Sequence, residues 1–268
     1  MLTWGVSDAY SWIPGSYKGF GAALLLDAQY QIKPDYSSVA GVLRSAAGTA
    51  SPVIYTNGIA IHGGKAAVAS PGSLVDIYGA NLAKEAATTP GLPLPATLGG
   101  VNVTVNGAAA PLYYVSSGLI VFQMPYSVAP GPVLVQVDAN GAPGQAAAIT
   151  VQPAAPSILT YGNDRAVVQN QDSTVNSPTN CALPGTYLTA YMIGSGPLTQ
   201  PIATGAAALT APLSYETLTT TATLGNAPAP VTFAGMTPGL MGLMQVNLQV
   251  PKVPGDLPLQ IKLGRVFQ

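Results

Sequence analysis

Two tryptophans, Trp4 and Trp12, are the first residues whose type and spacing suggest chemistry. They stand eight residues apart in WGVSDAYSW, and the chain of 268 residues contains no other tryptophan. A large aromatic ring offers a flat face for the apolar side of a ligand, and neighbouring polar groups serve the ligand's edge. The pair is therefore a candidate binding element, with a small core of two tryptophans as the alternative.

Other side chains with reactive or metal-binding groups lack partners at useful spacing. His62 in IAIHGGKA has no second ligand nearby in the sequence, so we expect an exposed loop histidine and no zinc site. Ser195 in IGSGP lacks the G-x-S-x-G pattern of a serine hydrolase. The single cysteine, Cys181, excludes an internal disulfide and is expected to be a small buried hydrophobe. The sequence predicts no cofactor and no metal.

Two further groups of residues allow two interpretations each. The loop 162–180 is rich in Asn and Asp, which cap turns through their own backbone but whose oxygens also suit Ca²⁺; its spacing matches no EF-hand. Alternating core and surface roles explain most tyrosines on strands, and a strip that binds polysaccharide is the alternative. Six tyrosines fall on expected strands or strand ends: Tyr78, Tyr113, Tyr114, Tyr126, Tyr187 and Tyr191.

Composition excludes several classes of partner. Charged residues are 7% of the chain and the net charge is −1, so no field attracts nucleic acid. No apolar run reaches the roughly 20 residues of a membrane span. Met1 is followed by LTWGV without the features of a secretory signal, and whether Met1 is a genuine start stays open.

The first 46 residues differ from the rest. TWGVS and AALLL are short apolar runs typical of strands, and a helical pattern follows from Pro34 through Tyr36, Val39, Ala40 and Leu43. This predicts one strand, a loop and a helix, which is a βα unit and not a domain. Small residues at 47–52 form the expected linker.

The remainder predicts an all-β chain. Short alternating runs are separated by NG, GN, PG and SSG turns, as in antiparallel sandwiches. The runs are SLVDIYG, VNVTVNG, PLYYV, LIVFQMP, VLVQVDANG, YLTAYMIG, TATLGN, PVTFAG, GLMQVNLQVP and PLQIKLG.

These runs repeat. SPGSLVDIYGANL (70–82) corresponds to LPGTYLTAYMIGSG (183–196), and the segment 103–137 corresponds to 222–263. The offset grows from 113 at the first motif to 126 at the FQMP and LQVP pair, because the second copy carries an insertion at 197–219. We expect sandwiches at 53–153 and 154–268, with PAAPS (153–157) as a hinge.

The residues WGVSDAYSWIP and ALLLDAQYQIKPDYSSVAGVL resemble the last strand and helix of the family 10 glycoside hydrolases, the xylanase (β/α)8 barrels. This resemblance covers residues 1–46. Residues 53–263 are similar to a tandem immunoglobulin-like C-terminal module of large secreted bacterial proteins. The implied fold is mainly β: two tandem IPT/TIG-like sandwiches preceded by a remnant βα unit of the barrel.

The resemblance implies that Trp4 and Trp12 line the sugar subsite at the bond to be cleaved. It also implies that both catalytic glutamates belong to earlier strands. Retaining hydrolysis needs two carboxyls about 5–5.5 Å apart, and the chain's two glutamates, Glu85 and Glu216, fall on expected loops of the sandwich region. We expect no catalytic residue in this chain.

Two functions remain. The chain is the C-terminal part of a secreted xylanase-like hydrolase that acts on plant polysaccharide, or it is a non-catalytic module for polysaccharide binding, cell-surface attachment or self-association. The expected location is extracellular or at the cell surface. The expected partners are a xylan-like polysaccharide, a second copy, or the rest of the barrel.

Overall fold

The computed structural model describes residues 7, 9, 16, 26–33, 36, 51–162, 164–253 and 255–264, and the backbone of 266–267. Trp4, Trp12 and almost all of the helix expected from Pro34 lie outside these residues. The chain divides into two compact units, Met1–Ala50 and Ser51–Gln268, and each is described by itself.

In the first unit, one bridge joins the two apolar runs of the sequence. Ser7 of TWGVS pairs with Leu26 of AALLL in a parallel bridge, and Ser7 is buried. The Ser7 hydroxyl donates to the carbonyl oxygen of Asp27 at 2.6 Å. The Asp27 carboxylate accepts the backbone N–H groups of Gln29 and Gln31, which closes a turn.

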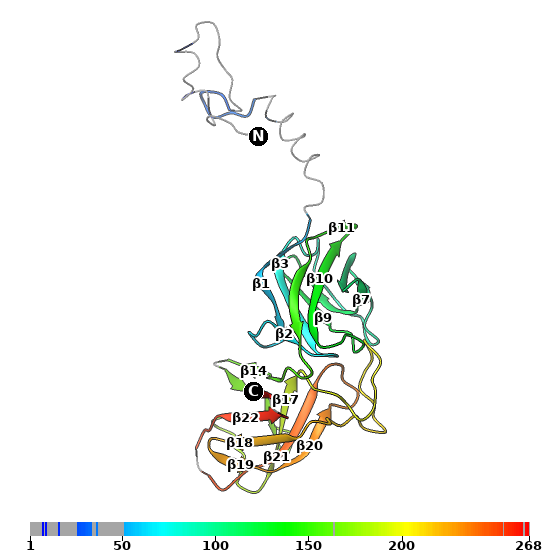
Figure 1. Ribbon diagram of the computed structural model, residues 1–268. Coiled ribbons are helices and arrows are strands. Elements are labelled where there is room, and N and C mark those ends of the chain that lie inside the picture. Colours follow the sequence, from blue (N-terminus) through cyan, green and yellow to red (C-terminus); the bar gives the residue numbers. More distant parts are fainter. Residues whose placement is uncertain are drawn as a thin grey trace. The chain divides into compact units, whose positions relative to one another are not determined.

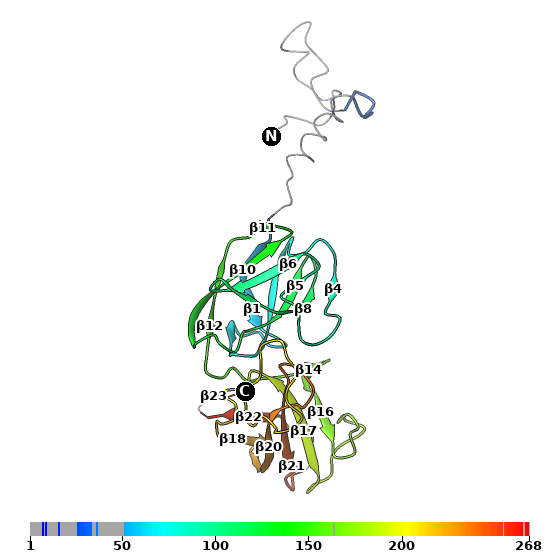
Figure 2. The same cartoon turned by 90° about the vertical axis from the view of Figure 1, so that its right-hand side faces the viewer.

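The second unit begins with a sandwich of two sheets (Figures 1 and 2). One sheet has the order β1 (Val53–Ile61), β3 (Leu74–Ala80), β9 (Leu119–Gln123), β8 (Leu112–Val115) and β4 (Ala87–Thr88). The other has the order β2 (Val68–Ala69), β12 (Ala147–Val151), β10 (Gly131–Ala139), β6 (Val101–Val105) and β5 (Thr97–Leu98), with β7 (Ala108–Ala110) on β6 and β11 (Ala142–Pro143) on β10.

A second sandwich follows. Its first sheet has the order β13 (Ser157–Ile158), β17 (Tyr187–Ile193), β21 (Met244–Gln249) and β20 (Val231–Met236), with β16 (Val168–Asn170) also on β17. Its second sheet has the order β19 (Ala227–Ala229), β18 (Thr220–Leu224), β22 (Leu259–Leu263) and β23 (Val266–Phe267). A short hairpin, β14 (Thr160–Tyr161) and β15 (Arg165–Ala166), stands apart.

The second unit is thus all-β in its described residues, and the predicted sandwich class is confirmed. Each of the ten predicted runs contains a strand. The Asn106–Gly107 and Asn140–Gly141 pairs join β6 to β7 and β10 to β11, and all four residues have φ between 49° and 81°. Positive φ at both central residues is what a type I′ hairpin turn requires. No described segment forms a helix long and apolar enough to cross a membrane.

The sequence repeat appears in the topology. β3, β9 and β8 of the first sandwich correspond to β17, β21 and β20 of the second, and β10 beside β6 corresponds to β22 beside β18. Even a register shift recurs: it falls between Leu112 and Tyr114 in β8 and between Val231 and Phe233 in β20. This correspondence pairs residues of the two sandwiches by position.

Each sandwich has its own apolar core, and a third cluster joins them. Phe122 and Ile77 are fully buried in the first core, and Leu248 and Ile261 are fully buried in the second. The third cluster combines two sets: Ile61, Leu74, Leu94 and Val121 from the first sandwich, and Ala155, Ile193 and Met241 from the second. The sandwiches therefore share a packed interface.

The connection between the sandwiches differs from the predicted hinge. Ala154 and Ala155 of PAAPS are buried, and the Ala155 N–H donates to the carbonyl of Gly194 at 3.0 Å. Gly194 has φ of 86° and lies too close to Ala155 to accommodate a Cβ. The hinge prediction was wrong because Pro and Ala suit a packed connector as well as a mobile one.

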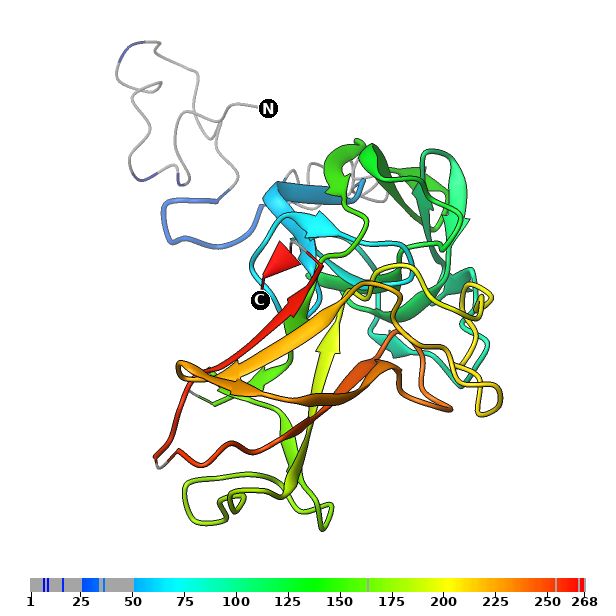
Figure 3. The same cartoon turned by 60° about the horizontal axis from the view of Figure 1, so that its bottom comes forward.

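The insertion at 197–219 supplies most of the polar contacts across this interface (Figure 3, yellow to orange). The Gly205 N–H donates to Gln123 Oε1 at 2.6 Å, and the Gly205 carbonyl accepts the Leu94 N–H at 2.8 Å. The Tyr126 N–H donates to Thr204 Oγ1 at 3.1 Å. The insertion in the second sandwich thus binds the first sandwich.

A chain that begins at Ser51 should fold without the first 50 residues, because its two cores and its interface all lie within Ser51–Gln268. The truncated chain should melt cooperatively near the melting temperature of the full chain and should show a near-ultraviolet circular dichroism signal from its own tyrosines. A truncated chain without tertiary signal, beside a full chain that melts cooperatively, would contradict this prediction.

Candidate ligand-binding face

Neither glutamate has a place in a hydrolytic pair. Glu85 is exposed on the first sandwich, and Glu216 belongs to the second. The Glu216 carboxylate accepts the N–H groups of Gly196 at 2.6 Å and Leu218 at 2.9 Å, while burial raises the pKa of this carboxyl. Glu216 ties two loop segments together, which is a structural role.

The structure corrects the expectation for His62. It lies directly after β1, half-exposed, and its Nδ1 is 2.7 Å from Oδ1 of the buried Asp76. The Tyr78 hydroxyl donates to the other Asp76 oxygen at 3.2 Å. The residues are 14 positions apart in sequence, so only the pairing of β1 with β3 brings them together.

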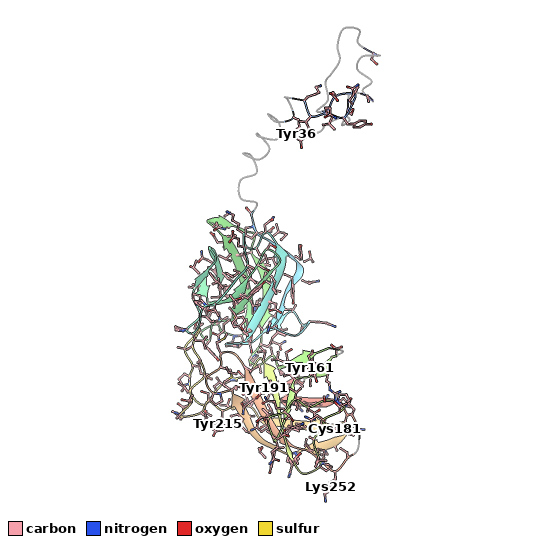
Figure 4. All side chains as sticks on the ribbon, turned by 180° about the vertical axis from the view of Figure 1, so that it is seen from behind. Tyr36, Tyr161, Cys181, Tyr191, Tyr215 and Lys252 are labelled. Carbon is pink, nitrogen blue, oxygen red and sulfur yellow. The ribbon has the colours of Figure 1, made fainter. Side chains whose placement is uncertain are left out.

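Cys181 was also predicted wrongly. It is exposed, and its Sγ lies 3.4 Å from the carbonyl oxygen of Ser177. The side chain belongs to the loop after β16, toward the lower end of the second sandwich in Figure 4. A residue in an exposed loop cannot be buried by core packing, whatever its hydrophobicity.

The Asn-rich loop uses its polar groups within itself. Asn180 Nδ2 donates to Thr174 Oγ1 at 2.7 Å, and Thr174 Oγ1 donates to Asp172 Oδ1 at 2.6 Å. Asn176 Nδ2 donates to Asn170 Oδ1 at 2.9 Å. Within the described part of the chain, no group of three His, Cys, Asp or Glu side chains could hold a metal ion. These contacts favour the turn-forming interpretation.

The strongest candidate site is the outer face of the sheet β16–β17–β21–β20. Alternate residues of β17 and β21 point into the second core, and the others form what we call the amide–tyrosine face. Direct cross-strand pairs place these residues together, because paired residues share one side of a sheet. The pairs are Tyr187 with Gln249, Thr189 with Asn247, Tyr191 with Gln245, Gln169 with Thr189, and Phe233 with Asn247.

Burial separates the two sides of this sheet. Tyr187 is 41% exposed, while Leu188 beside it is 6% exposed. Along β21, buried Met244, Val246 and Leu248 alternate with half-buried Gln245, Asn247 and Gln249. Beyond β20, the exposed ring of Tyr215 packs against Phe233 at a centroid distance of 5.3 Å. Figure 4 labels Tyr191 and Tyr215 on this sandwich.

Hydrogen bonds within the face fix its side chains. The Tyr191 hydroxyl donates to Gln169 Oε1 at 2.6 Å. Asn247 Oδ1 accepts from Thr189 Oγ1 at 3.1 Å and from Gln245 Nε2 at 3.4 Å. A hollow of about 390 Å³ opens over Tyr187, Thr189 and Asn247, and Gln171 and Ser173 of the Asn-rich loop form one of its walls. The result is a preorganised surface of tyrosine rings and neutral amides.

In the first sandwich, one end of the corresponding face is covered and apolar, whereas Tyr78 of the same face is exposed. The repeat places Leu74 opposite Tyr187 (offset 113) and Val121 opposite Asn247 (offset 126). Leu74 and Val121 lie in the interface cluster, where Met241 belongs to the second sandwich. The same position in the fold is thus a protein interface in one copy and an open polar surface in the other.

The six tyrosines singled out from the sequence fall in several places. Tyr187 and Tyr191 share the amide–tyrosine face, whereas Tyr78 and Tyr114 are on the corresponding sheet of the first sandwich and Tyr113 is exposed at the β8 irregularity. Tyr126 lines a cleft of about 470 Å³ between the sandwiches, and five of the twelve lining residues are prolines. Burial there raises the pKa of Tyr126 to about 12, so its hydroxyl stays protonated.

The fold defines this part of the chain as a pair of immunoglobulin-like β-sandwiches. Residues 65–154, which make up most of the first sandwich, match the IPT/TIG domain family.

The chain also resembles curated xylanases over a short stretch. It is 57% identical over 45 residues to endo-1,4-beta-xylanase 2 of Aureobasidium pullulans, which covers 17% of this chain and 12% of that enzyme. It is 48% identical over 45 residues to endo-1,4-beta-xylanase 1 of Gibberella zeae, covering 17% and 13%. The chain thus spans about an eighth of the length of these enzymes.

Solved structures give only distant similarities. The extracellular region of plexin A4 covers 84% of this chain and 18% of its own length, with 13% identity and a TM-score of 0.28. A crystal structure with a xylogluco-oligosaccharide covers 81% of this chain and 40% of its own length, with 14% identity and a TM-score of 0.25. These scores are too low to support an argument about this chain.

Proposed function

We propose that this chain is a non-catalytic, carbohydrate-associated part of a larger xylanase-like protein, and that its second sandwich binds a neutral polysaccharide. The observation that carries the proposal is the amide–tyrosine face. Sugar rings present C–H faces that pack on aromatic rings and hydroxyls that bond to amides. Tyr187 and Tyr191 supply the first group, and Gln245 and Asn247 supply the second.

The short xylanase similarity supports the choice of ligand. Its length of 45 residues corresponds to that of the segment 1–46, where Trp4 and Trp12 are proposed to line a sugar subsite in the complete barrel. An accessory module that holds the same polysaccharide keeps the enzyme near its substrate by raising the effective concentration. Such a protein acts outside the cell or on its surface, where polysaccharide is available.

Self-association through the same face has less support. The counterpart face that contacts protein in this chain uses Leu74 and Val121, which are buried and aliphatic. The open face has Tyr187 and Asn247 in their places. A surface built to bury another sandwich needs an apolar centre.

The test of this proposal is retention of the purified chain in native gels that contain soluble polysaccharide. We expect slower migration in arabinoxylan or glucan gels than in gels without polysaccharide, and no retardation of bovine serum albumin. Unchanged migration in every neutral polysaccharide would contradict the proposal.

The chain alone should have no glycosidase activity. Hydrolysis needs an acid and a nucleophilic carboxylate on either side of the bond, and Glu216 is engaged with backbone N–H groups while Glu85 lies on the other sandwich. The measurement is release of reducing ends from xylan by the purified chain, with a heated sample as the control. Release well above the heated sample would refute this prediction.

A further inference from the structure

The repeated FQMP and LQVP motifs place a glutamine at the same position in both sandwiches. Gln123 ends β9 and Gln249 ends β21, 126 residues later. Gln123 Nε2 donates to the carbonyl of Gly72 at 3.0 Å, and Gln249 Nε2 donates to the carbonyl of Gly185 at 3.0 Å. Gly72 and Gly185 are the glycines of the two repeated PG turns, so the same hydrogen bond occurs in both sandwiches.

This bond fixes which way each carboxamide points. Because the nitrogen donates to the turn carbonyl, the oxygen must face away from it. In the first sandwich, Gln123 Oε1 uses this orientation to accept the N–H of Gly205 from the second sandwich at 2.6 Å. At this position, therefore, a carboxamide oxygen of fixed orientation accepts a hydrogen bond from a donor in the other sandwich.

In the second sandwich the equivalent oxygen is open. Gln249 is half-exposed, and among the described residues its Oε1 has no hydrogen-bond partner. Gln249 pairs directly with Tyr187 across β17 and β21, so the two side chains are neighbours at one end of the amide–tyrosine face.

We propose that Gln249 is a ligand-binding residue whose Oε1 accepts a hydroxyl hydrogen of an uncharged sugar packed on Tyr187. This inference rests on the proposed function and specifies the ligand class. The face itself carries amides, hydroxyls and rings, with no charged side chain among its cross-strand pairs. The carboxylate of an acidic sugar would meet an acceptor oxygen where it needs a donor or a cation, so acidic glycans are selected against.

The experiment uses the full chain and its Gln249→Leu variant, which keeps the side-chain bulk and removes both the acceptor oxygen and the nitrogen that donates to the Gly185 carbonyl. Gln260→Leu is the matched control, because Gln260 is an exposed glutamine on β22, in the other sheet of the same sandwich. Affinity is measured by titration with xylohexaose and, in native gels, with arabinoxylan and polygalacturonate. We expect Gln249→Leu to bind xylohexaose 5- to 10-fold more weakly, Gln260→Leu to bind it with unchanged affinity, and polygalacturonate not to retard the wild type.

Three results would overturn the inference. The first is equal affinity of the wild type and of Gln249→Leu for neutral glycan. The second is tighter binding of polygalacturonate than of xylan by the wild type. The third is a concentration-dependent dimer of the wild type, seen by light scattering, that Gln249→Leu abolishes, because the open oxygen would then serve a second copy. A wild type that binds no polysaccharide contradicts the proposed function itself, which separates the two failures. Equal melting temperatures of the variants establish that each loss is local.

Discussion

Replacing both Tyr187 and Tyr191 by Ala should abolish retention of the chain by neutral polysaccharide. Aromatic side chains that anchor a ligand cost about 2 kcal/mol or more each when truncated, so the double variant should bind roughly 1,000-fold more weakly. Both rings are on the outer side of β17, while the core on the inner side is untouched. Affinity electrophoresis and titration calorimetry with xylohexaose measure the loss.

The matched control is Tyr113→Ala. Tyr113 is 41% exposed, as Tyr187 is, but it lies on β8 of the first sandwich. It should leave affinity unchanged. Tyr191→Phe keeps the ring and removes only the hydroxyl that donates to Gln169, and we expect a small loss. Undiminished binding by the double variant, at unchanged melting temperature, would place the glycan site elsewhere.

The second large effect concerns the interface between the sandwiches. Gln123→Ala should lower the free energy of unfolding by about 3 kcal/mol. The side chain is fully buried, and its removal leaves the Gly205 N–H and the Gly72 carbonyl without their partner inside the protein. Each unsatisfied buried group costs about 1–3 kcal/mol. Urea denaturation followed by tyrosine fluorescence and far-ultraviolet circular dichroism measures the change.

The repeat again provides the control, because Gln249→Ala removes the equivalent side chain where it is half-exposed. It should cost less than about 1 kcal/mol, since water replaces the lost bond. We also expect the Gln123→Ala transition to become biphasic as the sandwiches unfold separately. Equal costs for the two substitutions would mean that the Gln123–Gly205 bond does not couple the sandwiches.

The strands were predictable because the sequence carries both the period-2 pattern and its turns. What the pattern missed is informative. β1 contains Asn57–Gly58, a pair typical of hairpin turns, yet the strand continues through it with a shift of register between Ile54 and Ile59. Asn57 adopts a φ of 57° inside this irregularity. The same two residues favour a turn or a bulge, and only the partner strand β3 decides between them.

The site was predictable only in part. Tyr187 and Tyr191 could be singled out as strand tyrosines, but their grouping with Gln245, Asn247 and Gln249 depends on the register of β17 against β21. The repeat contained a usable signal. Where an aligned position is aliphatic in one copy and polar in the other, that part of the face is covered by protein in the first copy and open in the second. Trp4 and Trp12 lie outside the described residues, so their sugar-binding role stays a prediction.

The burial of the PAAPS connector also has consequences for proteolysis of the chain and for recombination of its gene. A protease needs an extended, accessible backbone, and Ala154, Ala155 and Ser157 of the connector are buried while the interface is closed. Cleavage should therefore leave the two sandwiches as one fragment. Recombination that separated them would expose Leu74 and Val121 to water, so we expect the two sandwiches to be transferred between proteins together.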